Sequence, residues 1–459
     1  LLGLRPCSSR DHRIQVPIVV HRRAYTRLLK SITLIEASEQ RAVFLSFLLI
    51  FLLMAAYYML RPVRDAMASD WSNTEISVLW NIQFFLSLIF VALYGTAISL
   101  FKFKNLVPLV YGFFAASFLI FYFASQLVSS PGLVDKSFYL WVSLFSLFHV
   151  SVFWSLMADL FSKEQSKRLF AFIYMGASAG AIVGPLVAAI AVNLLGSDAL
   201  MFAASLMMLL PLLIVVYLQP LKVTALGNEN QSVDLTHYKV GGNPLQGFKS
   251  FFSSPFLLAI ALFLLLYTAI SSFAYFEQTN LLRGFDTDRR TEILALLALV
   301  VIVLTFLLGF LATGRLATKW GMPVTLALIP LFMGAALVVL AFAPMLIILL
   351  ALQVARQAGN YGITRPAREM LFTAVPRESR FKSKPVVDVA IYRGGDAIWG
   401  SAFALLTDGV GLGMAAMAGT GAVIAAIWAA TGAALGVAFE RKTSFPASDS
   451  LAEGFGDEK

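Results

Sequence analysis

The chain is dominated by continuous apolar runs of about 20 residues, the length that an α-helix needs to cross the hydrocarbon of a bilayer. Residues 42–60 form the clearest run, in which Ser46 is the only strongly polar residue. The chain is 59% hydrophobic and 13% charged, whereas a soluble protein of this size carries roughly twice that charged fraction. The sequence therefore predicts an all-α membrane protein that crosses the bilayer many times.

Twelve transmembrane helices are predicted, and the longest polar stretch between them separates the first six from the last six. We therefore expect an N-terminal tail (1–41), a six-helix bundle (42–218), a linker (219–250), a second six-helix bundle (251–438) and a C-terminal tail (439–459). The spans lie near residues 42–60, 76–100, 106–128, 138–161, 168–194, 198–218, 252–278, 291–313, 322–343, 344–363, 386–407 and 414–438.

Lysine and arginine are unevenly divided between the two sides of the membrane. With a cytoplasmic N-terminus, the cytoplasmic segments carry 27 of these residues, counting Arg168 at the edge of span five, and the opposite loops carry 6, while Arg356 and Arg393 lie within spans. Positive residues concentrate in cytoplasmic loops, so we expect the tails and the linker to be cytoplasmic. The same bias explains the net charge of +9, and no nucleic-acid partner is implied.

The N-terminal region carries two further signals. The single cysteine, Cys7, excludes an internal disulfide, and no secretory signal is recognisable. The first methionine is Met54, inside the first span, so we expect that the chain does not begin at a native initiator.

A charged pattern, Arg-Pro-x-Arg-acid, closes two of the apolar runs, at residues 61–65 and 365–369. Charge is costly in hydrocarbon, so a charged cluster at the end of a membrane helix is a functional-site hypothesis. In the predicted topology the two clusters lie on opposite faces of the membrane, which favours opposed gates around a central site. The predicted gate residues in these clusters are Arg61, Asp65, Arg365, Arg368 and Glu369.

Arg64 has three interpretations that the sequence leaves open: recognition of an anion, closure of a gate, and anchoring at the interface. The first would use the paired hydrogen bonds that a guanidinium forms with phosphate or carboxylate. Tyr57 and Tyr58 lie one turn earlier, so at least one of them is expected to face the same cavity.

A polar stripe runs through span ten. Gln353, Arg356, Gln357 and Asn360 recur at three- and four-residue spacing and therefore share one helix face. Lipid would not tolerate a central arginine, so the stripe must face a wet cavity or a buried partner. Arg356, Gln353 and Asn360 are predicted to bind substrate, with an internal salt bridge as the alternative for Arg356.

Arg393 and four acids complete the candidate set. Arg393 and Asp396 are three residues apart and are expected to pair on one helix face. Asp159, Glu277, Asp388 and Asp396 are interpreted either as partners of gate arginines or as proton carriers. No Walker loop, zinc-ligand spacing or nucleophile elbow is present, so no enzymatic activity, cofactor or metal is expected.

Six plus six spans with a central cytoplasmic loop resemble the major facilitator superfamily, and two motifs support this. Residues 314–321, Gly-Arg-Leu-Ala-Thr-Lys-Trp-Gly, look like its cytoplasmic loop signature, with Thr318 in place of an acid. Residues 180–185, Gly-Ala-Ile-Val-Gly-Pro, look like its Gly-x-x-x-Gly-Pro motif, although a stripe of small residues also serves helix packing. The resemblance implies two six-helix bundles, with spans one, four, seven and ten lining a central cavity.

A narrower resemblance, over about residues 42–440, is to the ATP:ADP antiporter (nucleotide translocase, NTP/NDP exchange transporter-like) family. It rests on residues 57–65, 153–159, 365–372 and 392–396. In the true exchangers a basic residue in the Leu-Arg-x-x-basic-Asp stretch is important for transport, and Arg64 occupies that place. The exchangers also carry an acid about ten positions before the Phe-Trp of span four, where this chain has none.

The sequence thus favours a secondary transporter of an organic anion, with nucleotide exchange as a candidate. The alternatives are a proton-coupled exporter of drugs or metabolites, and a non-transporting sensor or scaffold. The expected partners are a small anionic solute and the lipid bilayer of a bacterial inner membrane, and a monomer is compatible with the sequence.

Overall fold

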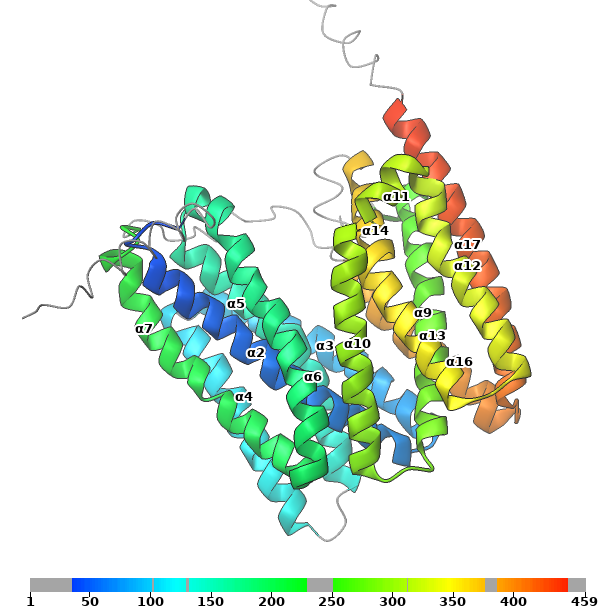
Figure 1. Ribbon diagram of the computed structural model, residues 1–459, viewed down its shortest axis with the longest axis horizontal. Helices are drawn as coiled ribbons and strands as arrows, with labels where there is room; N and C mark the ends of the chain where they lie inside the picture. The colour runs from blue at the N-terminus through cyan, green and yellow to red at the C-terminus, as the bar shows by residue number, and fades with distance from the viewer. Residues whose placement is uncertain are drawn as a thin grey trace, which may run out of the picture.

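The computed structural model describes residues 35–100, 103–128, 132–228, 251–311, 313–375 and 386–444, and the regular elements in these ranges are all helical. Figure 1 shows two helical bundles. The first contains α2 (Gln40–Met67), the short η1 (Ala68–Asp70), α3 (Asn73–Leu100), α4 (Phe103–Leu127), α5 (Gly132–Leu160), α6 (Lys163–Met207) and α7 (Leu210–Thr224).

The second bundle contains helices that are more often interrupted. Three π-helical segments, in which the hydrogen-bond ladder is locally widened, divide the helices of predicted spans ten and eleven. The elements are α9 (Pro255–Leu282), α10 (Thr287–Leu311), α11 (Thr313–Lys319), α12 (Gly321–Phe342), α13 (Leu346–Gly359), η2 (Asn360–Thr364), α14 (Arg365–Leu371), η3 (Phe372–Ala374), η4 (Val386–Ile391), α16 (Tyr392–Ala404), η5 (Leu405–Gly409) and α17 (Met414–Ser444).

Each predicted span has a helical counterpart. Within the described residues, eight helical segments are long and apolar enough to cross a membrane. One of these, residues 164–224, contains predicted spans five and six, and α6 kinks at Gly196, where φ is 80°. Spans two, ten and eleven are not among the eight, and the helices of spans ten and eleven are broken by π segments into pieces of 14 residues or fewer.

The Gly-x-x-x-Gly-Pro motif packs α6 onto α2. A Cβ atom added at Gly176, Gly180 or Gly184 would lie only 2.5, 2.3 or 2.6 Å from a backbone carbonyl oxygen of α2. Only glycine allows the two backbones to approach this closely. The packing interpretation of the motif is therefore confirmed.

The loop motif before α12 ends on a second constrained glycine. Gly321 has a φ of 79°, and a Cβ there would lie 2.7 Å from a carboxylate oxygen of Glu440. The same oxygen accepts the backbone N–H of Met322 at 2.9 Å. Gly321 thus lets Glu440 of α17 cap the start of α12, and the two helices pack against each other.

The two bundles meet at one end, where α2 and α9 finish, which we call the closed end. α10 packs against α2 and α6, and α16 packs against α3. One hydrophobic cluster there joins Trp71 and Tyr139 of the first bundle to Phe273, Phe276 and Phe403 of the second. Toward the opposite end, the open end, the bundles diverge (Figure 1).

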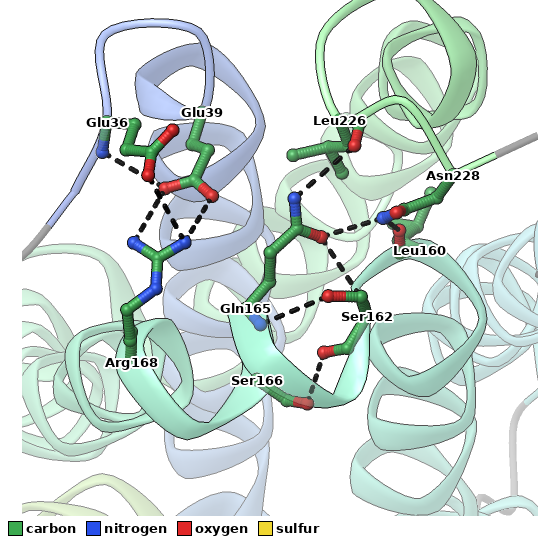
Figure 2. A network of polar contacts seen from close by, with 9 residues as sticks. All are labelled: Glu36, Glu39, Leu160, Ser162, Gln165, Ser166, Arg168, Leu226 and Asn228. Carbon is green, nitrogen blue, oxygen red and sulfur yellow. Dashed lines mark hydrogen bonds and ion pairs between the residues drawn. The ribbon is translucent and has the colours of Figure 1, made fainter.

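A polar network ties together the open end of the first bundle (Figure 2). Arg168 of α6 binds Glu39, just before α2, through two hydrogen bonds of 2.8 and 3.3 Å. Glu39 is only 2% exposed, and Glu36 lies 3.8 Å from the same guanidinium. The start of α2 is therefore held to the start of α6.

The other half of the network holds the residues that follow α7. Asn228 donates to the carbonyl oxygen of Leu160 at 2.9 Å and to Gln165 at 2.7 Å (Figure 2). Gln165 and Ser162 form a capping box at the start of α6, which satisfies free backbone N–H groups of the first turn. The chain therefore leaves the first bundle from a fixed point.

We predict that Arg168→Ala destabilises the protein by about 2 kcal/mol, because it leaves the buried Glu39 without its arginine; the partial exposure of Arg168 places this below a fully buried pair. The double variant Arg168→Ala/Glu39→Gln should recover part of that loss, because the stranded charge is removed. Chemical denaturation in detergent measures the free energy of unfolding of both variants. Arg289→Ala, which removes an exposed ion pair, is the control. A double variant no more stable than Arg168→Ala would contradict this interpretation.

Candidate functional site

A cavity of about 510 Å³ lies between the bundles, and its charge is strongly one-sided. Six arginines line it, while Asp396 is the one acid among the described lining residues. Arg61 and Arg64 come from α2, and the other four come from the second bundle. The remaining polar and aromatic lining includes Tyr57, Trp80, Gln83, Ser146, Tyr267, Ser271, Tyr275, Gln357, Asn360, Tyr361 and Tyr392, and the other arginines are Arg356, Arg365, Arg368 and Arg393.

Arg356 is held in the cavity wall by neutral groups. Its Nε and Nη2 both donate to Gln353 Oε1, at 3.0 and 2.7 Å, and its Nη1 donates to Ser271 at 2.8 Å and to Tyr267 at 3.3 Å. Asn360 donates to the same tyrosine hydroxyl at 3.0 Å. Arg356 is 6% exposed, and no carboxylate in the described part of the chain forms an ion pair with it. Its orientation is fixed, but its charge is not neutralised.

The Gln353, Arg356 and Asn360 stripe therefore faces the second bundle's share of the cavity. α9 supplies Tyr267 and Ser271 to complete it. Ser271 was not expected from the sequence, because its only signal is a polar residue in a long apolar helix. The alternative of an internal salt bridge for Arg356 has no support among the described contacts.

Arg64 is paired, in contrast to Arg356. It donates to Asp65 from Nη2 at 2.6 Å and from Nε at 2.9 Å, and from Nη1 to Ser143 at 3.0 Å. Asp65 also lies 3.7 Å from Arg61 and accepts a 3.3 Å hydrogen bond from Tyr275 of the second bundle. Asp65 thus connects the two α2 arginines to the opposite bundle, and the gate role of these residues stays a prediction.

The second Arg-Pro-x-Arg-acid pattern begins beyond the π segment η2. Arg368 forms an ion pair with Glu369 at 3.0 Å, and Arg365 is exposed to the cavity. Leu346, at the start of α13, packs against a second hydrophobic cluster that contains Ala66, near the end of α2 at the closed end. Because the chain then runs from the closed end toward the open end, the two patterns lie toward opposite ends of one cavity.

Arg393 and Asp396 form the expected pair on one face of α16, with 3.9 Å between Nη1 and Oδ2. This separation is long for an ion pair, so the contact is loose. A smaller cavity of about 100 Å³ brings both residues close to Arg64 and Tyr139 of the first bundle. Asp396 therefore lies where the two bundles face each other.

Tyr57 lines the cavity, and its ring lies 4.9 Å from that of the buried His149. Tyr58 does not line it: its side chain packs where Gly184 admits α2, and the guanidinium of Arg61 lies 6.0 Å from its ring. Of the two tyrosines, Tyr57 is therefore the one in the position expected of a substrate contact.

Two predicted gate acids lie away from the cavity. Asp159 pairs with Lys222 of the same bundle at 2.9 Å. Glu277 of α9 is 6% exposed, and no described residue forms a hydrogen bond or ion pair with it. Their role as gate partners stays a prediction.

The closed end carries polar contacts between the bundles that the sequence did not indicate. Arg290 of α10 binds Asp70 at 2.5 Å, and Arg283 donates to the carbonyl oxygen of Trp71 at 2.7 Å. Asp408 accepts hydrogen bonds from the backbone N–H and the hydroxyl of Thr74, both at 2.8 Å, and from Asn73 at 2.9 Å. These pairs are more than 200 residues apart in sequence, which is why no local pattern reveals them.

Asp408 lies just beyond predicted span 386–407. Hydrogen bonds stabilise the ionised form of its carboxyl. Burial acts against ionisation, but the hydrogen bonds from Thr74 and Asn73 outweigh it and lower the pKa of the Asp408 carboxyl. A carboxyl with a lowered pKa stabilises the fold above its ordinary pKa and loses this effect only as pH falls through the lowered one. The Asp408 contacts should therefore persist from about pH 8 to about pH 5.

We predict that Asp408→Ala opens the closed end in a measurable fraction of molecules, because three interbundle hydrogen bonds are lost at about 1 kcal/mol each. Spin-label distances across that end report the change. Asp159→Ala, which breaks a contact inside one bundle, is the matched control and should leave the distances unaltered. Equal distance distributions for Asp408→Ala and the parent protein would show that these bonds do not hold the bundles together.

Comparison with known proteins places the chain in a family. The model of the Major Facilitator Superfamily matches residues 46–378. The chain therefore belongs to the Major Facilitator Superfamily, and it is a multi-pass membrane transporter that works by alternating access. No curated protein matches the sequence.

Solved structures share the fold at low identity. A bacterial homologue of the human lysosomal transporter Spinster, in an inward-facing and unoccupied conformation, is 14% identical, with a TM-score of 0.58 over 89% of this chain and 99% of that one. The nucleoside transporter NupG is 13% identical, with a TM-score of 0.58 over 90% and 100%. A POT family transporter in complex with 5-aminolevulinic acid is 12% identical, with a TM-score of 0.61 over 87% and 96%. These likenesses show the fold alone.

Proposed function

We propose that the transported solute is an organic anion with more than one negative charge, and that nucleotides are the leading candidates. The observation that carries this proposal is Arg356, a nearly buried guanidinium that points its charge at a cavity without a carboxylate partner among the described residues. A charge in such surroundings is stabilised by a bound anion far more than it would be in water. A guanidinium also offers the paired donors that phosphate and carboxylate accept.

The distribution of partners supports a multivalent anion. Asp65 neutralises Arg64, Glu369 pairs with Arg368, and Asp396 lies loosely beside Arg393. Arg356 has only neutral partners, and Arg61 shares Asp65 at the longer distance of 3.7 Å. A solute with a single charge would leave part of this field unbalanced, whereas a phosphorylated solute would bridge arginines of both bundles.

Aromatic rings favour a solute with a flat ring system. Five tyrosines and Trp80 share the cavity wall with the arginines, and a base can stack on such rings. The volume of about 510 Å³ is within the range of small-molecule sites. The resemblance of residues 57–65 to the nucleotide exchangers, with Arg64 at the place of their basic residue, points the same way.

The charged residues at the two ends of the cavity would allow the site to open to each side of the membrane in turn. In the predicted topology the closed end is the outer one, so this conformation is inward-facing. Arg61, Asp65 and Tyr275 hold the outer end shut, and Arg365, Arg368 and Glu369 stand at the inner end where a second closure would form. Opening one end while the other closes would expose the site alternately.

We expect nucleotide or related polyanion counterflow in proteoliposomes, and a loss of about 10- to 100-fold in apparent affinity for Arg356→Gln, because one charged hydrogen-bond donor is removed. Arg289→Gln, at an arginine outside the cavity, is the matched control and should retain wild-type affinity. Labelled ATP, ADP and phosphate are the test solutes, with a neutral nucleoside for comparison.

The other outcomes select the alternatives. Transport of neutral solutes that is unaffected by Arg356→Gln would contradict anion transport and favour a proton-coupled exporter. A protein that transports none of the solutes and is stabilised by none of them in thermal unfolding would favour a sensor or scaffold.

We predict that Asp396→Asn tightens anion binding by about threefold or more, because it removes the one acid among the described cavity-lining residues and its repulsion of the solute. Thermal-shift titration with the same anions measures this effect. Weaker binding in Asp396→Asn would show that Asp396 orients Arg393 for the solute rather than competing with it.

A further inference from the structure

Glu277 differs from two other acids of the membrane region, the buried Asp65 and the half-buried Asp396. Asp65 is bound by Arg64, and Asp396 lies beside Arg393. Glu277 is 6% exposed, yet none of the described residues donates a hydrogen bond or an ion pair to its carboxylate. The protein itself therefore covers Glu277.

The position of Glu277 places it directly behind the contact between the bundles. Tyr275, two residues earlier, donates to Asp65 of the first bundle at 3.3 Å. The ring of Phe276 lies 5.0 Å from Trp80 of α3 and 4.7 Å from Phe403. Gln278 lines a small cavity with Arg61 and Asp65. The neighbours of Glu277 on α9 thus contact the first bundle at this end, through Tyr275 with Asp65 and Phe276 with Trp80, while Phe403 belongs to the same bundle as α9.

The charged and titratable groups on the elements packed against α9 contact residues other than Glu277. None of those that the structure describes interacts with Glu277. They are Arg61 and Arg64 with Asp65 on α2, Asp70 with Arg290 at η1, Arg356 with Gln353 on α13, Arg393 with Asp396 on α16, and Glu440 with Met322 and Lys442 with Phe256 on α17; Tyr139 of α5 hydrogen-bonds to Tyr275.

We propose that Glu277 is a proton-binding site that couples protonation to the conformation of the transporter, with the neutral acid favouring closure of the end at which α2 and α9 finish. An ionised carboxylate buried without a counter-ion is strongly disfavoured relative to the neutral acid. Separation of the bundles would remove the contacts of Tyr275 with Asp65 and of Phe276 with Trp80 and admit water to this stretch, where the ionised form is tolerated. A proton bound at Glu277 therefore stabilises the closed arrangement, whatever the solute.

The test follows conformation rather than transport, so it is independent of the proposed substrate. Spin labels at Leu133→Cys and Val410→Cys, two exposed positions at the closed end of opposite bundles, report the separation in a Cys7→Ser background. In the parent protein we expect the closed fraction to rise as pH falls from about 8 to about 5.5, a range in which buried carboxyls titrate. Glu277→Gln, which mimics the neutral acid, should stay closed at every pH in that range.

Asp408→Asn is the matched control. It alters an acid of the same end that stays ionised in this range, so the level of closure should change while the dependence on pH remains. Another titratable group, His149, is retained in all variants and lies buried beside Tyr57 and Phe145.

Each outcome decides the proposal. A pH-independent parent protein would contradict it, as would a Glu277→Gln variant with the parental pH profile, which would assign the effect to His149 or another group. Because glutamine reproduces the shape of the neutral acid, failure of Glu277→Gln to fold would count against it equally. Absence of anion counterflow with an intact Glu277-dependent pH profile would reject the proposed solute and leave the proton site standing.

Discussion

A guanidinium that faces a cavity inside a membrane protein must be balanced by a carboxylate, by water or by a solute, because the surrounding dielectric screens it poorly. Most arginines of this cavity are balanced by an acid on a nearby turn, as Arg64 is by Asp65. Arg356 is instead fixed by Gln353, Ser271 and Tyr267, which align its donors without cancelling its charge. The site is therefore arranged to bind an anion. This role explains why its lining is rich in arginine.

The two ends of the cavity differ in whether their polar contacts join the bundles. At the closed end, aromatic packing between Tyr139, Phe276 and Phe403 is reinforced by ion pairs and hydrogen bonds between the bundles, among them Arg290 with Asp70. At the open end the described polar contacts stay within one bundle, as Arg168 with Glu39 does. An interface that is polar as well as apolar can separate without exposing a continuous apolar surface, which suits a transporter that must open it in each cycle.

The sequence predicts the helices well and the site in part. Apolar runs of membrane length place a helix at each of the twelve predicted spans, because the bilayer dictates both length and composition; short helices such as α11 fall in predicted loops. The stripe of Gln353, Arg356 and Asn360 is visible because the side chains share one helix face, and the Arg393–Asp396 pair is visible for the same reason. Tyr267 and Ser271 accept hydrogen bonds from Arg356 although they lie on another helix. Asp408 accepts hydrogen bonds from Thr74, which is more than 300 residues away in the sequence. Such contacts depend on how the helices and bundles pack. The sequence pattern of a single helix therefore cannot predict them.

Recognition of negative charge by Arg356 is measured most directly with a series of solutes that differ in charge. Binding of adenosine, AMP, ADP and ATP to the purified protein, at low and at high salt, compares solutes that share one ring system and differ in charge. We expect negligible binding of adenosine and an increase of about tenfold, or 1.4 kcal/mol, with each added phosphate, weakened by salt and flattened in Arg356→Gln. Equal binding of adenosine and ATP, or a series unchanged by Arg356→Gln, would contradict the account.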